Sequence, residues 1–299
     1  MVASQQAWPH PLAASCRPVL AKAGRFFDNN SIMAWPVLLP FRCPATHKTV
    51  SCIIRGRSSN SADVRDIALD GLNLSSCKDI LDLGCGFGFM SEALAKRAAG
   101  DAHITGVDAW HSNEAEFTKK VAATGCRASF VCAKVVRELA FPDRSFDVVS
   151  CSYSLYFFVD VLPEIARVLR PDGLLIALTH TEGSARSLLQ IAAVPEEESD
   201  LLCLLQRFST ETGDSVLSEF FHDIRRVDYD NSLVFAADDV DELLMLLKFK
   251  LPLLVPGSTS DDELPERIVR NARAALSRSG EVVIEKNDTV FRCRDPICH

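Results

Sequence analysis

A glycine-rich stretch, KDILDLGCGFGFM from Lys78 to Met90, constrains this chain more than any other part of its sequence. It begins with an apolar run over residues 80–83, which is short enough for a parallel strand covered on both faces. Glycines then alternate with other residues over 84–88, so backbone can approach a ligand closely. Residues 91–99, SEALAKRAA, are strong helix formers, and their free N–H groups should face that ligand. Strand, glycine loop and helix in this order are typical of the nucleotide-binding half of an open α/β sheet.

Predicted strands and helices alternate on both sides of this loop. A helix is predicted ahead of the first strand, over 63–74, and the later strands and helices follow in turn. The alternation requires a parallel sheet with right-handed crossovers, so we expect an α/β fold with a doubly wound, Rossmann-like sheet. The predicted strands are 103–108, 128–133, 146–151 and 174–178, and the predicted helices between them are 114–124 and 161–169.

The pattern is less regular beyond His180. Helices are predicted over 184–212, 239–249 and 264–277. Residues 223–235 include a possible strand pair about Asp230-Asn231, and residues 281–293 alternate in polarity across Asn287-Asp288 as a hairpin would. We therefore divide the chain into a loose extension over 1–30 and one domain over 31–299. That domain has a core over 63–183, a lid insertion over 184–256, and a terminal helix and hairpin over 262–295.

The amino-terminal segment is poor in acids. Residues 1–62 contain the single acid Asp28 against seven lysines and arginines, a bias that resembles an organelle transit peptide. Three prolines, at positions 9, 11 and 18, interrupt any amphipathic helix there, so we favour an extension that packs over the site. The eleven cysteines are odd in number and several lie in apolar runs, which favours reduced thiols and a cytoplasmic location.

Charge and composition restrict the partners of the protein. The formal net charge of −8 argues against nucleic acid as a partner, because a nucleic-acid binder needs a basic surface. Prolines and lysines interrupt every long apolar run, so no membrane span is predicted. Cys293, Cys298 and His299 are too few for a structural zinc site, which uses four ligands, and no metal site is predicted.

Further motifs distinguish between the possible ligands of the glycine loop. The dinucleotide fingerprint requires a glycine where Phe89 stands, which disfavours an NAD oxidoreductase. Asp82 precedes the glycines, and Asp108 lies twenty residues past Gly88, at the strand end where an acid accepts hydrogen bonds from ribose hydroxyls. The motifs FPDRSFDVVSCSYSLYFF and RVLRPDGLL follow in order. With these motifs, residues 78–180 resemble the class I S-adenosylmethionine-dependent methyltransferases, in particular the broad group related to ubiquinone-biosynthesis methyltransferases.

This resemblance implies S-adenosyl-L-methionine as the cofactor and a seven-stranded sheet whose last two strands come from the terminal hairpin. The sequence departs from the group at residues 132–134, which lack the acid that often contacts adenine, and at Pro171-Asp172-Gly173, which replaces the usual Pro-Gly-Gly. The implied cofactor-binding residues are Asp82, Gly84, Cys85, Gly86, Gly88, Asp108, Ala109, Ala133 and Ser150.

Methyl transfer requires exclusion of water, alignment of the reacting atoms and a base where the nucleophile is protonated. Candidate bases are Tyr153 and Tyr156 after the fourth strand, and His180 and Glu182 after the fifth. His180 is the first choice because an unperturbed histidine titrates near neutral pH. The alternatives are a hydrogen-bonded structural role for His180 and a role for Tyr156 as a wall of the pocket.

The sequence favours a methyltransferase acting on an O, N or C nucleophile of a small molecule. Segment 35–41 and the insertion over 184–256 would form an apolar lid, which indicates an aromatic or lipophilic acceptor. A protein or RNA methyltransferase of the same fold is the first alternative. A non-catalytic S-adenosylmethionine-binding or scaffold protein, with a partner at residues 240–254, is the second.

Overall fold

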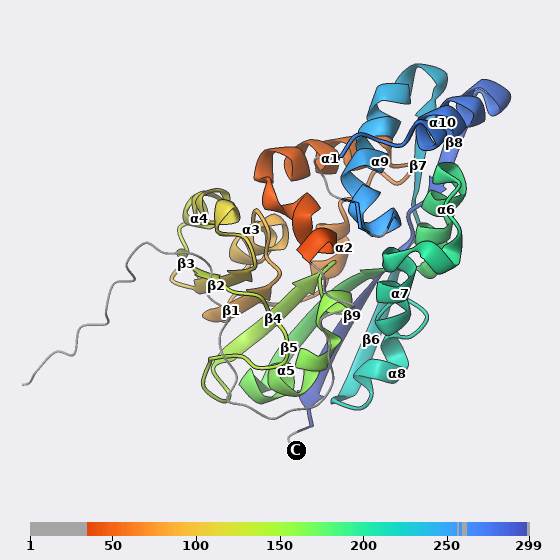
Figure 1. Cartoon of the computed structure of the whole chain (residues 1–299). Coiled ribbons are helices and arrows are strands. Elements are labelled where there is room, and N and C mark those ends of the chain that lie inside the picture. Colours follow the sequence, from red (N-terminus) through yellow and green to blue (C-terminus); the bar gives the residue numbers. More distant parts are fainter. Residues whose placement is uncertain (1–34, 256, 259–261, 298–299) are drawn as a thin grey trace, which may run out of the picture.

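The computed structural model describes residues 35–255, 257–258 and 262–297. Expectations for residues 1–34, Cys298 and His299 lie outside these described residues. A twisted sheet of seven strands forms the lower part of the molecule in Figure 1, and a helical cap lies above one end of it. The prediction of an α/β, doubly wound fold is confirmed.

The sheet has the strand order β3-β2-β1-β4-β5-β9-β6. The first five strands run parallel, while β9 is antiparallel to both of its neighbours. Five predicted strands are therefore confirmed, although β5 begins earlier than predicted. The bounds are β1 (Asp79–Leu83), β2 (His103–Asp108), β3 (Arg127–Cys132), β4 (Phe146–Ser152), β5 (Leu169–His180), β6 (Phe221–Tyr229) and β9 (Asp288–Pro296).

Helices cover both faces of the sheet, because alternate side chains of each strand enter different clusters of buried residues. Ile80 packs with residues of α2, α3 and α4, whereas Leu81 belongs to the larger cluster with residues of α5, α6 and α7. The helices are α1 (Pro44–Arg57), α2 (Val64–Leu69), α3 (Phe89–Ala95), α4 (Glu114–Ala122), α5 (Leu162–Val168), α6 (Glu182–Ala192), α7 (Asp200–Arg207), α8 (Gly213–Leu217), α9 (Val240–Leu254) and α10 (Glu266–Ser279). Short 3-10 turns are η1 (Trp35–Arg42), η2 (His111–Asn113), η3 (Leu155–Phe157), η4 (Val159–Val161), η5 (Glu196–Glu198) and η6 (Ala237–Asp239).

The predicted terminal hairpin is wrong. Strand β8 (Glu281–Glu285) does not pair with β9 but with β7 (Ser232–Ala236), in a separate two-stranded sheet. Strands β6 and β7 likewise do not pair with each other. The seventh strand of the main sheet is β6, from the predicted insertion. At the predicted turns, Asp230-Asn231 and Asn287-Asp288, the chain bends but stays extended. Strand β6 continues into β7 at the first, and β8 continues into β9 at the second.

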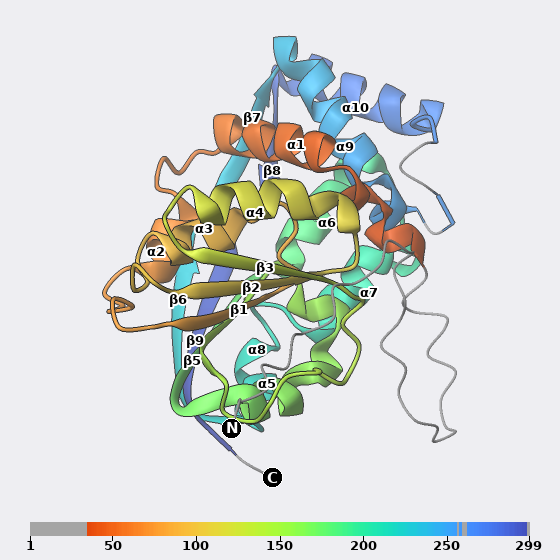
Figure 2. The same ribbon diagram turned by 90° about the vertical axis from the view of Figure 1, so that its left-hand side faces the viewer.

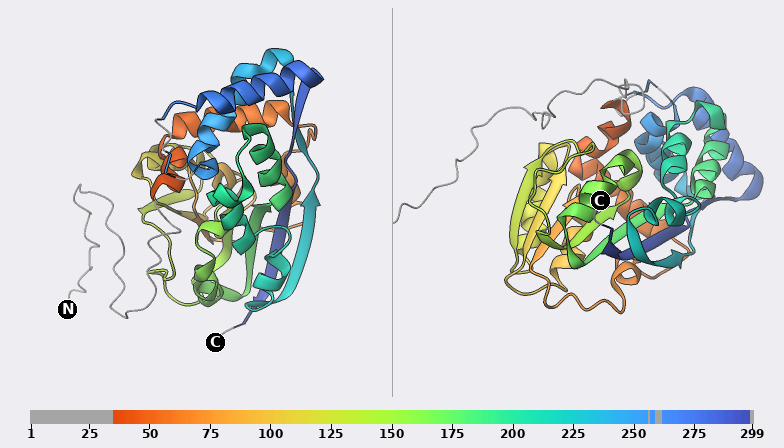
Figure 3. Two further views of the ribbon diagram at one scale, coloured as in Figure 1. Left: turned by 45° about the vertical axis from the view of Figure 1, so that its right-hand side comes forward. Right: turned by 90° about the horizontal axis from the view of Figure 1, so that it is seen from below.

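These strands form one bent antiparallel ribbon. Tyr229 pairs with Asp288 before the bend and Ser232 with Glu285 after it, so the register is unchanged across it. The Lys286 amide donates to the Asn231 carbonyl at 3.0 Å within the bend. Figure 3 shows the ribbon rising from the sheet into the cap along one edge of the molecule. The bend thus carries side chains from the sheet directly under the cap.

The cap consists of α1, α9 and α10 with β7 and β8. Helix α1 begins at Pro44 and lies beside α9 and α4 (Figure 2). Arg57 at its carboxyl end contacts Asp239 and Glu242, each at 2.6 Å, and Lys48 contacts Glu116 of α4 at 2.9 Å. The Arg57 ion pairs join α1 to the start of α9 within the cap, whereas the Lys48–Glu116 pair joins the cap to α4 of the sheet domain.

Two further findings bear on the earlier expectations. Eight cysteines of the described part carry free thiols, whereas Cys132 is disulfide-bonded, so the prediction of reduced cysteines is wrong at that position. Among the described residues, no helix is both long and apolar enough to cross a membrane.

Candidate functional site

A cavity of about 760 Å³ lies between the carboxyl ends of the sheet strands and the cap. Its floor includes Asp82 of β1, Asp108 of β2 and His180 of β5, while α1, α9 and the bend of the ribbon supply the roof. The glycine loop borders one part of this space, the loop end, and apolar and charged side chains of the cap and the ribbon bend border another part. The His47 ring lies between them, with its centroid 4.8 Å from that of Phe87 in the loop and 5.5 Å from that of Phe249 in α9. Most of the predicted site residues therefore line one cavity, whereas Gly88, Ser150 and the candidate base Glu182 are not among the described residues of its wall.

Gly84, Gly86 and Gly88 of the loop have positive φ angles of 73°, 50° and 80°, but the space around them differs. A Cβ on Gly84 would lie 2.5 Å from Ser154 Cβ, and one on Gly88 would lie 3.2 Å from Phe117 Cα. A Cβ on Gly86 would meet only the His47 ring, at 3.8 Å. Gly84 and Gly88 therefore permit close packing in the protein, while Gly86 leaves its backbone open to the cavity.

Asp108 is held by three donors. Its Oδ2 accepts a hydrogen bond from the Gly86 amide at 2.9 Å, and its Oδ1 accepts from the Trp110 amide at 2.8 Å and Asn113 Nδ2 at 3.0 Å. A carboxylate offers about four acceptor positions, so roughly one position, on Oδ2, stays available to a ligand. Burial raises the pKa of this carboxyl, and the three donors oppose that effect. Asp108 thus both fixes the loop and faces the cavity.

Asp82 has one oxygen without a protein partner. Its Oδ2 accepts from the Ser91 hydroxyl, while its buried Oδ1 accepts no hydrogen bond from the described residues. Burial raises its pKa to about 6, and the Ser91 hydroxyl, together with the nearby Ser150 hydroxyl, opposes this shift. An unpartnered buried oxygen at a cavity wall is costly, so it marks a position where a ligand donor is expected.

The other residues predicted to bind a cofactor are placed as follows. Cys85, Ala109 and Ala133 line the cavity. Gly88 and Ser150 are not among the residues described at its wall, since Gly88 begins α3 and Ser150 is buried beside Asp82.

A buried polar network occupies the other end of the cavity. Asp288, at the bend of the ribbon, accepts on Oδ1 from His180 Nδ1 at 2.6 Å and on Oδ2 from the Tyr153 hydroxyl at 2.7 Å. Lys286 Nζ contacts both oxygens, at 2.8 and 2.6 Å. The Tyr153 ring stacks on the His180 ring with centroids 4.5 Å apart. The carboxylate therefore holds a histidine, a tyrosine and a lysine in one arrangement.

The protonation states in this network follow from burial. Desolvation, reinforced by Lys286, lowers the pKa of His180 to about 4, so its imidazole is neutral at pH 7. Lys286 Nζ lies 3.3 Å from Nδ1, but the ionised Asp288 carboxylate is nearer, at 2.6 Å, and can only accept, so we assign the ring proton to Nδ1. Nε2 then carries the lone pair and contacts no described protein donor. Burial also raises the pKa of Tyr153 and of Tyr156, so both phenols stay protonated and can only donate or accept hydrogen bonds.

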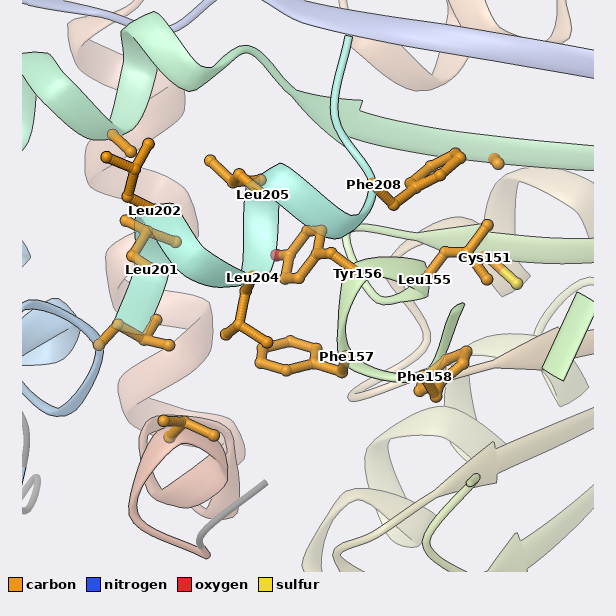
Figure 4. Close-up of a cluster of buried hydrophobic side chains, with 14 of the residues drawn as sticks. Cys151, Leu155, Tyr156, Phe157, Phe158, Leu201, Leu202, Leu204, Leu205 and Phe208 are labelled. Carbon is orange, nitrogen blue, oxygen red and sulfur yellow. The ribbon is translucent and has the colours of Figure 1, made fainter. Parts of the chain in front are cut away.

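Tyr156 and its neighbour Phe157 lie where η3 meets α7. In Figure 4 their rings face Leu204 and Leu205, and the ring centroids of the two aromatics are 4.7 Å apart. Tyr156 is 3% exposed and lines the cavity. Its position fits a wall of the pocket, the alternative considered from the sequence.

Several cavity residues were missed from the sequence. Helix α1, which contributes His47, was not predicted. Among the cavity lysines, Lys250 of α9 was interpreted as an interruption of an apolar segment, and Lys286 of the bend as part of the predicted hairpin. The only signal for Lys250 was its position within an otherwise apolar helix. No sequence signal marked Trp110, whose indole donates to the Leu38 carbonyl at 3.0 Å beside the loop.

Comparison with known proteins identifies a methyltransferase segment that contains the glycine loop. Residues 80–173 match the family model described as a methyltransferase domain. The predicted resemblance to methyltransferases is confirmed for this segment. The methyltransferase segment contains the glycine loop, Asp108 and both tyrosines, whereas His180, Lys250 and Asp288 lie outside it.

Individual relatives are similar over part of the chain. The ubiquinone biosynthesis O-methyltransferase of Idiomarina loihiensis is 33% identical over 124 residues, covering 39% of this chain and 48% of that protein. The nocamycin O-methyltransferase of Saccharothrix syringae is 35% identical over 98 residues, covering 32% and 35%. The chain thus spans about half the length of such curated relatives, or less. A solved geranyl diphosphate C-methyltransferase from Streptomyces coelicolor is 14% identical, with a TM-score of 0.41 over 77% of this chain and 78% of that chain.

Proposed function

We propose that this chain is an S-adenosylmethionine-dependent methyltransferase that transfers a methyl group to an O, N or C nucleophile of a small aromatic or lipophilic molecule. The observation that carries the proposal is one cavity with two chemically different ends. The glycine loop and two acids border one end, and apolar side chains with a neutral histidine border the other.

The loop end suits the cofactor. The unpartnered Asp82 Oδ1 would accept from the ammonium group of the methionine part, and the open Gly86 backbone allows close approach. Asp108 Oδ2 has room for one ribose hydroxyl, while Gly84 and Gly88 keep the loop in shape. Cys85, Ala109 and Ala133 would border the adenosine, and Ser150 would support Asp82. The bound cofactor supplies a methyl group on a positively charged sulfur.

The opposite end suits an apolar acceptor. Its wall combines side chains from α1, α6, α7, α9, β7 and β8. All six elements lie outside residues 80–173, the methyltransferase segment. With the acceptor bound, this apolar wall would exclude water from the reacting atoms, and its composition favours an aromatic or lipophilic molecule. These wall residues are Ile54, Leu188, Leu201, Leu205, Leu233, Leu246, Phe249 and Ile284.

His180 is the proposed base. Asp288 fixes its ring and tautomer, so that Nε2 can accept a proton from the nucleophile as the carbon bond to sulfur breaks. The carboxylate then stabilises the imidazolium. Tyr153 is a positioning residue that acts through Asp288, and Tyr156 shapes the wall of the cavity.

The first experiment concerns the cofactor. S-adenosylmethionine and its demethylated product should raise the melting temperature, whereas NAD should not. Stabilisation by NAD alone would overturn the proposal.

A second experiment addresses the acceptor. The protein is incubated with cofactor carrying a labelled methyl group and an extract, and the extract is then fractionated. The label should appear in a small molecule that partitions into organic solvent. Label in a protein or RNA band would contradict the small-molecule acceptor, and no label with retained cofactor binding would favour a non-catalytic binding protein.

A further inference from the structure

We propose that the acceptor carries a carboxylate, separate from the methylated atom, and that this carboxylate binds the ammonium group of Lys250. The inference rests on the proposed methyl transfer and names the acceptor class more closely. It comes from the charges at the acceptor end of the cavity.

Lys250 lies in the carboxyl-terminal half of α9, between Phe249 and Leu251, both of which are buried. It lines the cavity together with His180 and Lys286. Its Nζ lies 5.8 Å from the centre of the Phe249 ring, but it forms no hydrogen bond or ion pair with another described residue. A cation is therefore held in a largely apolar space without a partner of opposite charge.

The nearby carboxylates are already engaged. The two oxygens of Asp288 accept hydrogen bonds from His180 and Tyr153 and form an ion pair with Lys286. Glu285 accepts on Oε1 from Thr181 at 2.9 Å and from Asn287 at 3.3 Å. Lys286 and Asp288 thus form an ion pair, Glu285 is held by neutral donors, and Lys250 forms no ion pair with a described residue.

Burial and the charge of Lys286 lower the pKa of Lys250 to about 8, while Asp288 opposes the shift. The ammonium form consequently still predominates at pH 7. Burying an unpaired cation is costly, and a ligand anion would offset that cost with a charge-assisted hydrogen bond.

The base and the lysine have separate tasks. Because His180 can take a proton from the nucleophile, the nucleophile need not arrive as an anion. A carboxylate elsewhere on the acceptor would meet Lys250 and orient the neutral nucleophile toward His180. The expected acceptor is therefore a lipophilic or aromatic acid.

A matched pair of fluorescent probes tests this charge. The pair is 4-(1-pyrenyl)butyrate, which has a carboxylate, and 4-(1-pyrenyl)butanol, which does not. Binding of each is titrated at pH 7 against the full chain saturated with S-adenosylhomocysteine, for the unchanged protein, Lys250→Met, Lys250→Arg and Lys248→Met. Lys248 is the control, since it lies on the same helix but contacts Glu263 at 3.7 Å and is not among the described cavity residues.

Lys250→Met should weaken binding of the acid about tenfold or more and leave the alcohol within about twofold, as expected for one charge-assisted hydrogen bond. Lys250→Arg should keep most of the affinity for the acid, and Lys248→Met should change neither probe. Equal losses for both probes, an unchanged affinity for the acid, or no binding of the acid to the unchanged protein would overturn the inference. Failure of the proposed function is seen separately, as absence of S-adenosylhomocysteine binding in calorimetry of the same samples.

Discussion

The two ends of the cavity are built in different ways. At the loop end, Asp82, Gly86 and Asp108 lie within 27 residues of one another along the chain, from Asp82 to Asp108, on two adjacent strands. At the acceptor end, His180, Lys250 and Asp288 come from three distant parts of the chain. One end depends on local backbone geometry, and the other depends on how the cap packs on the sheet.

The two ends of the cavity also differ in the charges that they hold. The loop end holds two buried acids with unused acceptor capacity, which suits a cationic ligand. The acceptor end holds a compensated Lys286–Asp288 pair and the uncompensated Lys250, which suits an anion. In the proposed function, a positively charged donor would bind at the loop end, and the proposed acceptor would bring a negative charge to the other end. Variants can test whether these two ends are independent.

The largest expected effect concerns Asp288. Asp288→Asn leaves Lys286, with a side chain 14% exposed, without its carboxylate, so the free energy of unfolding should fall by about 3 kcal/mol. Urea unfolding at pH 7 measures this change. Asp228→Asn is the control, because Asp228 pairs with Arg226 on an exposed part of the same ribbon and should cost about 1 kcal/mol or less.

Adding Lys286→Met to Asp288→Asn should restore part of the lost stability, since no unpaired cation then stays buried. If Asp288→Asn and Asp228→Asn cost the same, the acceptor end does not depend on a buried pair, and the contrast between the two ends fails.

A slightly smaller effect is expected at the loop end. Asp108→Ala removes the acceptor for the Gly86 amide and for the ribose, so affinity for S-adenosylhomocysteine should fall about 100-fold, or roughly 2.7 kcal/mol. Calorimetry measures it, with the exposed Asp101→Ala as the control. Binding of the pyrene acid should stay within about threefold of the unchanged protein. A parallel loss of both ligands would indicate that the two ends are coupled.

The sequence predicted the loop end well because the relevant signals are local. Strand β2 has the predicted bounds, and Asp108 lies at its carboxyl end beside the loop, as the spacing required. The role of the glycines was less readable. The packing of Ser154 against Gly84 and of Phe117 against Gly88 distinguishes these glycines from Gly86, which is open to a ligand.

The acceptor end was poorly predicted because its signals are not local. Polarity alternates across Asn287-Asp288 equally in a hairpin and in a bent strand that continues, and only the pairing of β9 with β5 and β6 decides between them. That pairing brings Asp288 to His180, 108 residues earlier in the chain. Lys250 has no periodic signal at all, since one lysine in an apolar helix is usually solvated.

The next effect is a pH dependence of cofactor binding. The pKa of Asp82 is raised from 3.8 to about 6, by burial first and with Asp108 contributing, while Ser91 and Ser150 lower it. An ammonium group requires the ionised carboxylate, so affinity for S-adenosylhomocysteine should be constant above about pH 7, fall through a midpoint near pH 6, and then decrease by up to tenfold per pH unit. Calorimetry from pH 5 to pH 8 measures this dependence.

Ser91→Ala sharpens the same test. It removes a hydrogen bond that lowers the pKa of Asp82, so the midpoint should move to higher pH. His180 is not the source of this transition, because its pKa of about 4 lies lower. An unchanged midpoint in Ser91→Ala would assign the transition to another group.

The smallest effect is a gain in stability at Lys250. Its pKa is lowered from 10.5 to about 8, so the unfolded chain binds the proton more tightly and the penalty is fully present below pH 8. The penalty disappears as the pH rises toward 10.5. Because the ammonium group faces a cavity that admits water, we expect Lys250→Met to raise the free energy of unfolding by only about 1 kcal/mol at pH 7. The melting temperature should then rise by roughly 2 °C.

Lys248→Met, on the same helix, should leave the melting temperature within about 1 °C, since its ion pair with Glu263 is exposed. The difference between the two variants should shrink as the pH is raised from 7 to 10, because the unchanged protein loses its buried charge. A Lys250→Met variant that is less stable than the unchanged protein would mean that the lysine supports the cap. Together with weaker binding of the pyrene acid, a gain in stability would instead identify Lys250 as a residue kept for its ligand at a cost to the fold.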